Sequence, residues 1–197
     1  MIASLGDKEE PKILFEVTSM DITGPYPTTP RGNKYFLTFI NHLTKYAEAF
    51  PIPDHTAETC ARLYSSQIVT RHGSGSTLFT DQDREFMSSF FQRMFKIIGV
   101  RRVRTSRFHA YSNGMVEGHH RSLHSGISHY VNANQYNLDK FVPFYLISHS
   151  ATHHRTTVFS PFYLLHGREM VLNSTANLKA RLPKDNTDDD QRLENLK

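Results

Sequence analysis

Short apolar runs separated by turn residues occupy the first quarter of the chain. Residues 15–23 are predicted to form a strand that ends at the turn made by Gly24 and Pro25. Residues 34–42 and 46–52 are rich in aromatic and β-branched side chains and follow one another closely. This pattern predicts a hairpin directly after the first strand.

Beyond the hairpin, helical periodicity alternates with short strands. Thr56 is the predicted N-cap of a helix whose apolar side chains recur at helical spacing as far as Ile68. The predicted order is β-β-β-α-β-α-β-α-α, which indicates an α/β domain built around a mixed sheet. The later elements are a strand at 78–80, a helix over 86–98 that ends at Gly99, a strand at 100–103, and helices at 115–131 and 138–150.

The length of 197 residues suits one folded domain with tails. We predict a disordered lead-in over 1–12, one folded domain over 13–170 and a flexible tail over 171–197. No apolar run approaches the ~18 residues that would indicate a membrane span, so no membrane association is expected.

Two features of composition narrow the function. The single cysteine, Cys60, excludes a disulfide framework or a cysteine-based zinc site within the chain and fits the cytosol or the nucleus. Residues 93–121 contain seven basic residues against one acid, Glu117, although the whole chain carries a net charge of only +4. Such a segment is either an electrostatic footprint for a polyanion or a solvated charged face.

Three acids stand out by their positions. Asp21 lies towards the end of the first strand, Asp81 directly follows the strand at 78–80, and Glu117 lies in the first turn of the helix at 115–131. If the two strands are neighbours, Asp21 and Asp81 would lie side by side. Carboxylate clusters bind hard divalent cations, which neutralise their mutual repulsion. The alternative is that these residues are ordinary turn or helix-cap acids.

Five segments resemble the integrase catalytic core of gypsy-class retrotransposons. The resemblance runs from about Phe15 to Met170, its segments occur in the family's order, and the spacing from Asp81 to Glu117 matches the family. The segments are DITGPYP (21–27), GNKYFLTFINHLTKYAEAFPI (32–52), TDQDREF (80–86), SNGMVE (112–117) and SPFYLLHGRE (160–169).

The resemblance implies a ribonuclease-H-like fold with a five-stranded mixed sheet flanked by helices. It also implies that Asp21, Asp81 and Glu117 are the catalytic acids and bind two Mg²⁺ or Mn²⁺ ions. The expected activity is that of a DDE-type polynucleotidyl transferase, which trims 3′ DNA ends and then joins them to target DNA. Both reactions are in-line phosphoryl transfers.

Further residues are expected to contact DNA. Asn113 and Gly114 match the loop that the family places beside the element's DNA end, and Tyr111 would stack or contact phosphate. Arg121 and His124 follow Glu117 by four and seven residues, so they share its helix face. The implied partners are element and target DNA and further copies of the chain, and the implied location is the nucleus, with the cytoplasm as the alternative.

The chain departs from the family pattern at four positions. Asp83 replaces a usual Gly, Ala110 a usual Pro and Gly118 a usual Arg, whereas Asn41 replaces an acid outside the metal-binding set. We expect little direct effect from Asn41. The other three flank the acids, so an alternative hypothesis is a catalytically impaired or domesticated module that binds DNA or protein. A nuclease of the same fold is a third reading, which the SPFYLLHGRE segment disfavours.

Overall fold

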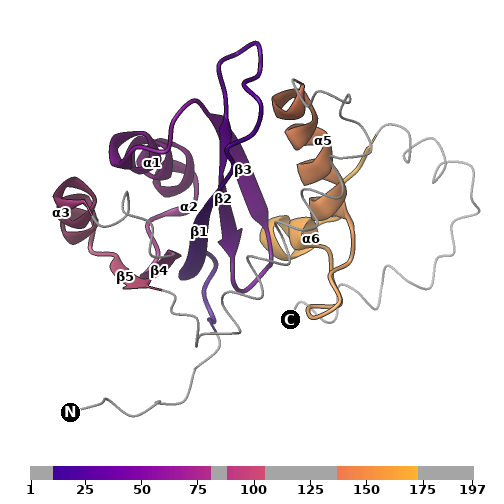
Figure 1. The fold of residues 1–197 in the computed structure, drawn as a ribbon. Helices are drawn as coiled ribbons and strands as arrows, with labels where there is room; N and C mark the ends of the chain where they lie inside the picture. Colours follow the sequence, from indigo (N-terminus) through magenta and orange to yellow (C-terminus); the bar gives the residue numbers. More distant parts are fainter. Residues whose placement is uncertain (1–10, 81–87, 105–136, 173–197) are drawn as a thin grey trace, which may run out of the picture.

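A five-stranded mixed sheet forms the centre of the computed structural model, which describes residues 11–80, 88–104 and 137–172. The strands lie in the order β3-β2-β1-β4-β5 (Figure 1). This arrangement confirms the predicted fold class. The strands are β1 (Val17–Thr23), β2 (Tyr35–Asn41), β3 (Ala47–Ile52), β4 (Thr77–Thr80) and β5 (Arg101–Arg104).

The first three strands form an antiparallel meander, which contains the predicted hairpin of β2 and β3, and β4 and β5 extend the sheet in parallel beyond β1. Asp21 pairs with Thr38 across the β1–β2 ladder, and Met20 pairs with Thr80 across the parallel β1–β4 ladder. Strand β5 pairs in parallel with β4 and forms the sheet edge opposite β3. The crossover from β1 to β4 therefore brings two distant segments into direct contact.

One layer of helices covers the sheet face that carries Met20 and Leu78 (Figure 1). The predicted cap at Thr56 is confirmed, because its side chain accepts a hydrogen bond from the Thr59 amide. Ser88 caps the last helix of this layer and Gly99 ends it with a left-handed backbone, φ 73°. The layer consists of α1 (Ala57–Leu63), which continues through the π-helical η1 (Tyr64–Val69) into α2 (Thr70–His72), and α3 (Ser89–Ile98).

Helices α5 (Leu138–Ala151) and α6 (Pro161–His166) lie on the other side of the sheet, next to β3 (Figure 1). Helix α6 is absent from the predicted elements. Its end signals are nevertheless present, because Ser160 caps it, Pro161 begins it and Gly167 ends it. The six-residue helix is too short to produce a clear hydrophobic period. The predicted helix at 115–131 lies outside the described residues.

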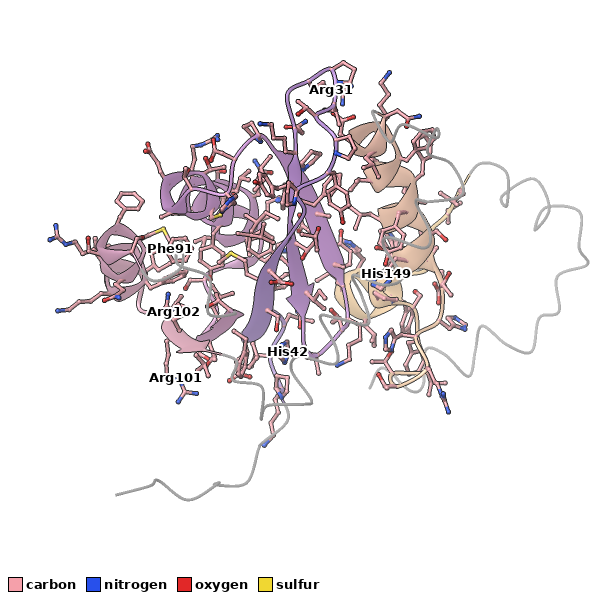
Figure 2. The ribbon with its side chains drawn as sticks, viewed as in Figure 1. Arg31, His42, Phe91, Arg101, Arg102 and His149 are labelled. Carbon is pink, nitrogen blue, oxygen red and sulfur yellow. The ribbon has the colours of Figure 1, made fainter. Side chains whose placement is uncertain are left out.

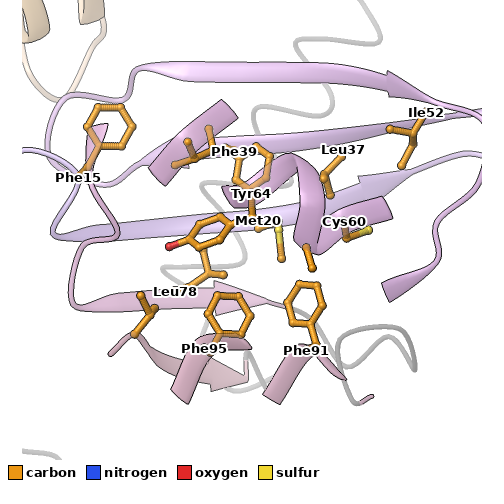
Figure 3. Packing of buried hydrophobic residues seen from close by; sticks show 13 residues of the cluster. Phe15, Met20, Leu37, Phe39, Ile52, Cys60, Tyr64, Leu78, Phe91 and Phe95 are labelled. Atoms are coloured by element: carbon orange, nitrogen blue, oxygen red, sulfur yellow. The ribbon is translucent and has the colours of Figure 1, made fainter. Parts of the chain in front are cut away.

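The main hydrophobic core lies between the sheet and the α1–α3 layer (Figure 3). Aromatic rings fill much of it, and Tyr64, Phe91 and Phe95 pack together with ring centroids about 5 Å apart. Its most deeply buried members include Met20, Leu37, Phe39, Cys60, Tyr64, Leu78 and Phe91. No helix in the described parts of the chain is long and apolar enough to cross a bilayer.

A smaller core joins α5 to the sheet. Phe36, Ala49, Leu138 and Val142 are buried together. Next to them, the buried Asp139 carboxylate accepts hydrogen bonds from the Thr29 hydroxyl at 3.0 Å and from the Asn33 side-chain amide at 3.1 Å. These bonds fasten the loop between β1 and β2 to the start of α5. They also give this acid a structural role.

Candidate functional site

The candidate site begins at Asp21, in the second half of β1. Because side chains alternate along a strand, Met20 points into the main core and Asp21 to the opposite face. Asp21 is half-buried, whereas Met20 is 1% exposed. The Thr38 hydroxyl donates a hydrogen bond of 3.1 Å to the Asp21 carbonyl oxygen, which fixes the backbone that carries the carboxylate.

The β1–β4 register relates Asp21 to the second candidate acid. Met20 pairs with Thr80, so the next residues in the two chain segments are Asp21 and Asp81. The two strands are neighbours, which is the condition on which the expected side-by-side placement of the two acids depends. Asp81 itself lies outside the described residues, as does Glu117, so the acid cluster as a whole stays a prediction.

Two positions before Asp21 on the same sheet face, Ser19 contacts a histidine that also packs on β4. The His42 Nε2 atom and the Ser19 hydroxyl share a buried hydrogen bond of 2.6 Å. The His42 ring also stacks on Phe79 of β4, with centroids 5.3 Å apart. Burial, together with the nearby Lys45 ammonium, lowers the pKa of His42 to about 4, so the ring is neutral at pH 7. His42 thus joins the two strands that lead to Asp21 and Asp81 without adding charge.

Asn41 forms the turn beside this histidine. Its side-chain oxygen accepts hydrogen bonds from the Leu43 amide at 2.8 Å and from the Thr44 amide at 3.5 Å, and the residue is 1% exposed. Sequence reasoning assigned no role to Asn41, Ser19 or His42 beyond the departure at Asn41. The alternation of Ser19 and Asp21 on one strand face was the available signal.

The donor chemistry at Asp21 suits a hard divalent cation, because its carboxylate offers oxygen ligands on a partly exposed face. His42, which lies on the same sheet face, is instead held by Ser19. Within residues 11–80, 88–104 and 137–172, no three His, Cys, Asp or Glu side chains gather into a metal-binding group. The predicted ligand set draws two of its three acids from outside these ranges.

The residues predicted to contact DNA also lie beyond the described parts of the chain. They are Tyr111, Asn113, Gly114, Arg121 and His124, and the departures Asp83, Ala110 and Gly118 lie there too.

The model of the integrase core domain family matches residues 13–110. The chain belongs to this family. Integrase cores generally use divalent metal ions. The match spans the sheet from β1 to β5 and includes both Asp21 and Asp81.

Retroelement polyproteins are the curated relatives of this integrase core. Over 160 residues it is 28% identical to the retrovirus-related Pol polyprotein from transposon 412 of Drosophila melanogaster. This alignment covers 81% of the chain and 13% of the relative. Over 92 residues it is 30% identical to the Gag-Pol polyprotein of feline leukemia virus, covering 47% of the chain and 5% of the relative. The integrase core therefore spans a small part of each polyprotein.

Solved structures share the fold. The catalytic core domain of BIV integrase superposes with a TM-score of 0.61 at 21% identity, covering 76% of this chain and 92% of that one. The integrase core also matches a chain of a simian T-cell lymphotropic virus intasome in complex with PP2A regulatory subunit B56 gamma. That TM-score is 0.64 at 16% identity, with 80% of this chain and 56% of the other covered. The chain thus has the ribonuclease-H-like fold of retroviral integrase cores.

Proposed function

We propose that this integrase core catalyses DNA integration, by trimming the 3′ ends of element DNA and joining them to target DNA. In the first reaction water replaces one ester oxygen of a phosphodiester and frees a 3′-hydroxyl. In the second, that hydroxyl replaces an ester oxygen at a target phosphodiester, so each reaction breaks one P–O bond and forms another.

The observation that carries the proposal is the parallel register of β1 and β4. It pairs Met20 with Thr80, directly before the two acids that the family resemblance implies. The sequence separates these acids by sixty positions, and an arbitrary pair of turn acids would have no reason to follow paired positions on adjacent strands. This placement favours a shared metal site over the reading in which Asp21 and Asp81 are unrelated cap or turn residues.

Asp21, Asp81 and Glu117 would hold two Mg²⁺ or Mn²⁺ ions, which stabilise the attacking and leaving oxygens of such a displacement when bound. The chain's own contribution is to hold the carboxylates in place. The Thr38 hydrogen bond orients the backbone at Asp21, and the Ser19–His42–Phe79 contacts tie β1 to β4 immediately below it. Rigid support of this kind is what a precise ligand set requires.

The proposed partners are element ends and target DNA, contacted through Tyr111, Asn113, Gly114, Arg121 and His124. The proposed location is the nucleus. We further propose that the core acts as a homo-oligomer. Two apolar side chains on α5, Phe144 and Ile147, are 64% and 38% exposed. They support this proposal, because a second copy of the chain could bury them away from water.

Metal titration tests the proposed site. Mn²⁺ is titrated calorimetrically into the folded wild-type chain, Asp21→Asn and Asp81→Asn. We expect binding to the wild type and a loss of at least about tenfold in affinity in each variant, because a charged oxygen ligand is removed. Metal-dependent cleavage of a DNA duplex should be lost in parallel.

Glu58→Gln is the matched control, since Glu58 is an exposed acid at the start of α1, away from the site. It should bind Mn²⁺ like the wild type. Equal affinity in Asp21→Asn and the wild type would show that the site is assigned wrongly. Duplex binding without metal-dependent cleavage would instead favour the catalytically impaired module.

A further inference from the structure

An exposed arginine on the edge strand β5 shares the sheet face that carries Asp21. The parallel register pairs Val17 of β1 with Thr77 of β4, and Thr77 with Arg101 of β5. Residues paired in this way point to the same face of a sheet, and so do Val17 and Asp21, which are four positions apart on one strand. Arg101 therefore belongs to the face of the candidate acid site.

The next residue of β5 belongs to the opposite face. Arg102 pairs with Leu78, which lies in the main core, and is half-buried. Figure 2 shows the side chain of Arg102 directed towards α3 and that of Arg101 directed away from it. Arg101 is exposed. The edge strand therefore presents Arg101, rather than Arg102, to the face that carries Asp21.

The separation of Arg101 from Asp21 follows from the geometry of the sheet. Two strand spacings of about 4.8 Å and four residue steps of about 3.3 Å place their Cα atoms about 16 Å apart. No charged side chain of the described residues on β1, β4 and β5 shares this face with them. The other residues of these strands that point to it are Val17, Ser19, Thr23, Thr77, Phe79 and Val103.

The guanidinium of Arg101 is oriented by a neighbour but is not neutralised by it. It donates a hydrogen bond of 3.4 Å to the Thr77 hydroxyl, which is an uncharged group. Because a guanidinium carries five N–H donors, this contact uses a small part of its donor capacity. Among the described residues no carboxylate forms an ion pair with Arg101. Glu16, directly before β1, instead accepts hydrogen bonds from two backbone amides of its own N-terminal turn.

We propose that Arg101 binds a backbone phosphate of the DNA whose reacting phosphodiester lies at Asp21. A planar guanidinium matches two phosphate oxygens, and such a contact positions a duplex without reading its base sequence. The separation of about 16 Å corresponds to about five steps of 3.4 Å along the duplex. The proposal rests on the proposed function for the identity of the ligand and of the acid site.

Protection of the sheet edge is the competing role of this residue. Strand β5 is the edge opposite β3, and a charged side chain on an edge strand opposes pairing with the edge of another sheet. Arg101→Glu keeps a charge at the edge but repels a phosphate. Edge protection therefore predicts that this variant behaves like the wild type, whereas a phosphate contact predicts weaker DNA binding.

The test is binding of a defined DNA duplex to the full chain, measured by fluorescence anisotropy over a range of salt concentrations without divalent metal. We expect Arg101→Ala to bind about threefold to tenfold more weakly, with a log-log salt slope lower by about 1. Arg101→Glu should bind more weakly still, and Arg101→Lys should retain most of the affinity. Arg93→Ala is the matched control, because it removes an exposed arginine from α3 on the opposite face.

Neutral linkages in the DNA locate the contact. Single methylphosphonates are placed in turn along a duplex that the chain cleaves with Mn²⁺. One of them, about five steps from the cleaved phosphodiester, should raise KM for the wild type but not for Arg101→Ala. With the unmodified duplex, Arg101→Ala should raise KM and leave kcat unchanged, because a remote contact holds substrate and transition state equally.

Wild-type affinity and salt slope in Arg101→Ala would overturn the proposal, as would an equal loss in Arg93→Ala, which would reduce the effect to net charge. Wild-type DNA binding by Arg101→Glu would assign the residue to edge protection instead. Asp21→Asn separates this proposal from the proposed function. It should abolish metal-dependent cleavage and leave the salt-dependent binding, with its sensitivity to Arg101→Ala, intact.

Discussion

On one face of the sheet, Met20, Leu37 and Phe39 are buried against the α1–α3 layer (Figure 3). On the other face, the alternating residues of the same strands include Asp21 and Thr38, joined by a hydrogen bond from hydroxyl to carbonyl. The first face stabilises the fold through apolar burial, whereas the second combines a smaller apolar core under α5 with directional contacts among polar groups.

The comparison shows how the fold separates stability from chemistry. Apolar packing is non-directional and follows the area removed from water. Polar groups that are buried must instead each find a partner, as Ser19 and His42 do. A change on the first face should therefore affect stability most, whereas a change on the second should show dependence on pH and on individual hydrogen bonds.

The largest expected effect comes from the apolar face. Phe91→Ala should lower the free energy of unfolding by about 3–5 kcal/mol, because it leaves a cavity where a fully buried ring packed. Chemical denaturation measures the loss. Phe90→Ala, at the adjacent and 54% exposed position of the same helix, should change stability by no more than about 0.5 kcal/mol. Similar losses in both would mean that α3 does not pack as described.

The next effect is a pH dependence on the polar face. The pKa of His42 is about 4 in the folded chain against 6.5 for an unperturbed histidine, so the unfolded chain binds more protons between these two pH values. Titration of His42 should therefore leave the free energy of unfolding at its full value above pH 6.5. As the pH drops from 6.5 towards 4, it should lower that free energy by up to about 3 kcal/mol.

Denaturation at several pH values, compared with His42→Gln, checks this expectation. Glutamine has no titratable group, so the variant should lose stability less steeply over this pH range. Part of the slope should persist, because burial also lowers the pKa of His149. Identical slopes for the wild type and the variant would show that His42 is not buried as described.

A smaller effect is expected from a single hydroxyl. Ser19→Ala removes the hydrogen-bond partner of His42 and should cost about 1–3 kcal/mol, because a buried ring nitrogen loses its contact. Ser66→Ala, at an exposed position of η1, is the matched control and should be close to neutral. A neutral Ser19→Ala would indicate that water reaches His42.

Much of the fold follows from local signals. The hairpin, the Thr56 cap and the Gly99 helix end were predicted, because hydrophobic periodicity and helix capping depend on residues close together in the sequence. Helix α6 carried equally local signals at Ser160 and Gly167, but its six residues gave no hydrophobic period. The π-helical η1 depends on packing and has no sequence pattern of this kind.

The features of the candidate site also divide into those that the sequence identified and those that only the tertiary structure placed. The sequence by itself determined the identity and spacing of the three acids, the basic segment and the family resemblance. Only the tertiary structure decided that Met20 pairs with Thr80 and that His42 shares a hydrogen bond with Ser19. It also decided that α3, with its cations, packs on the sheet face opposite Asp21. The reason is physical, because side-chain type is a property of one residue whereas register and facing arise from contacts between segments far apart in the chain.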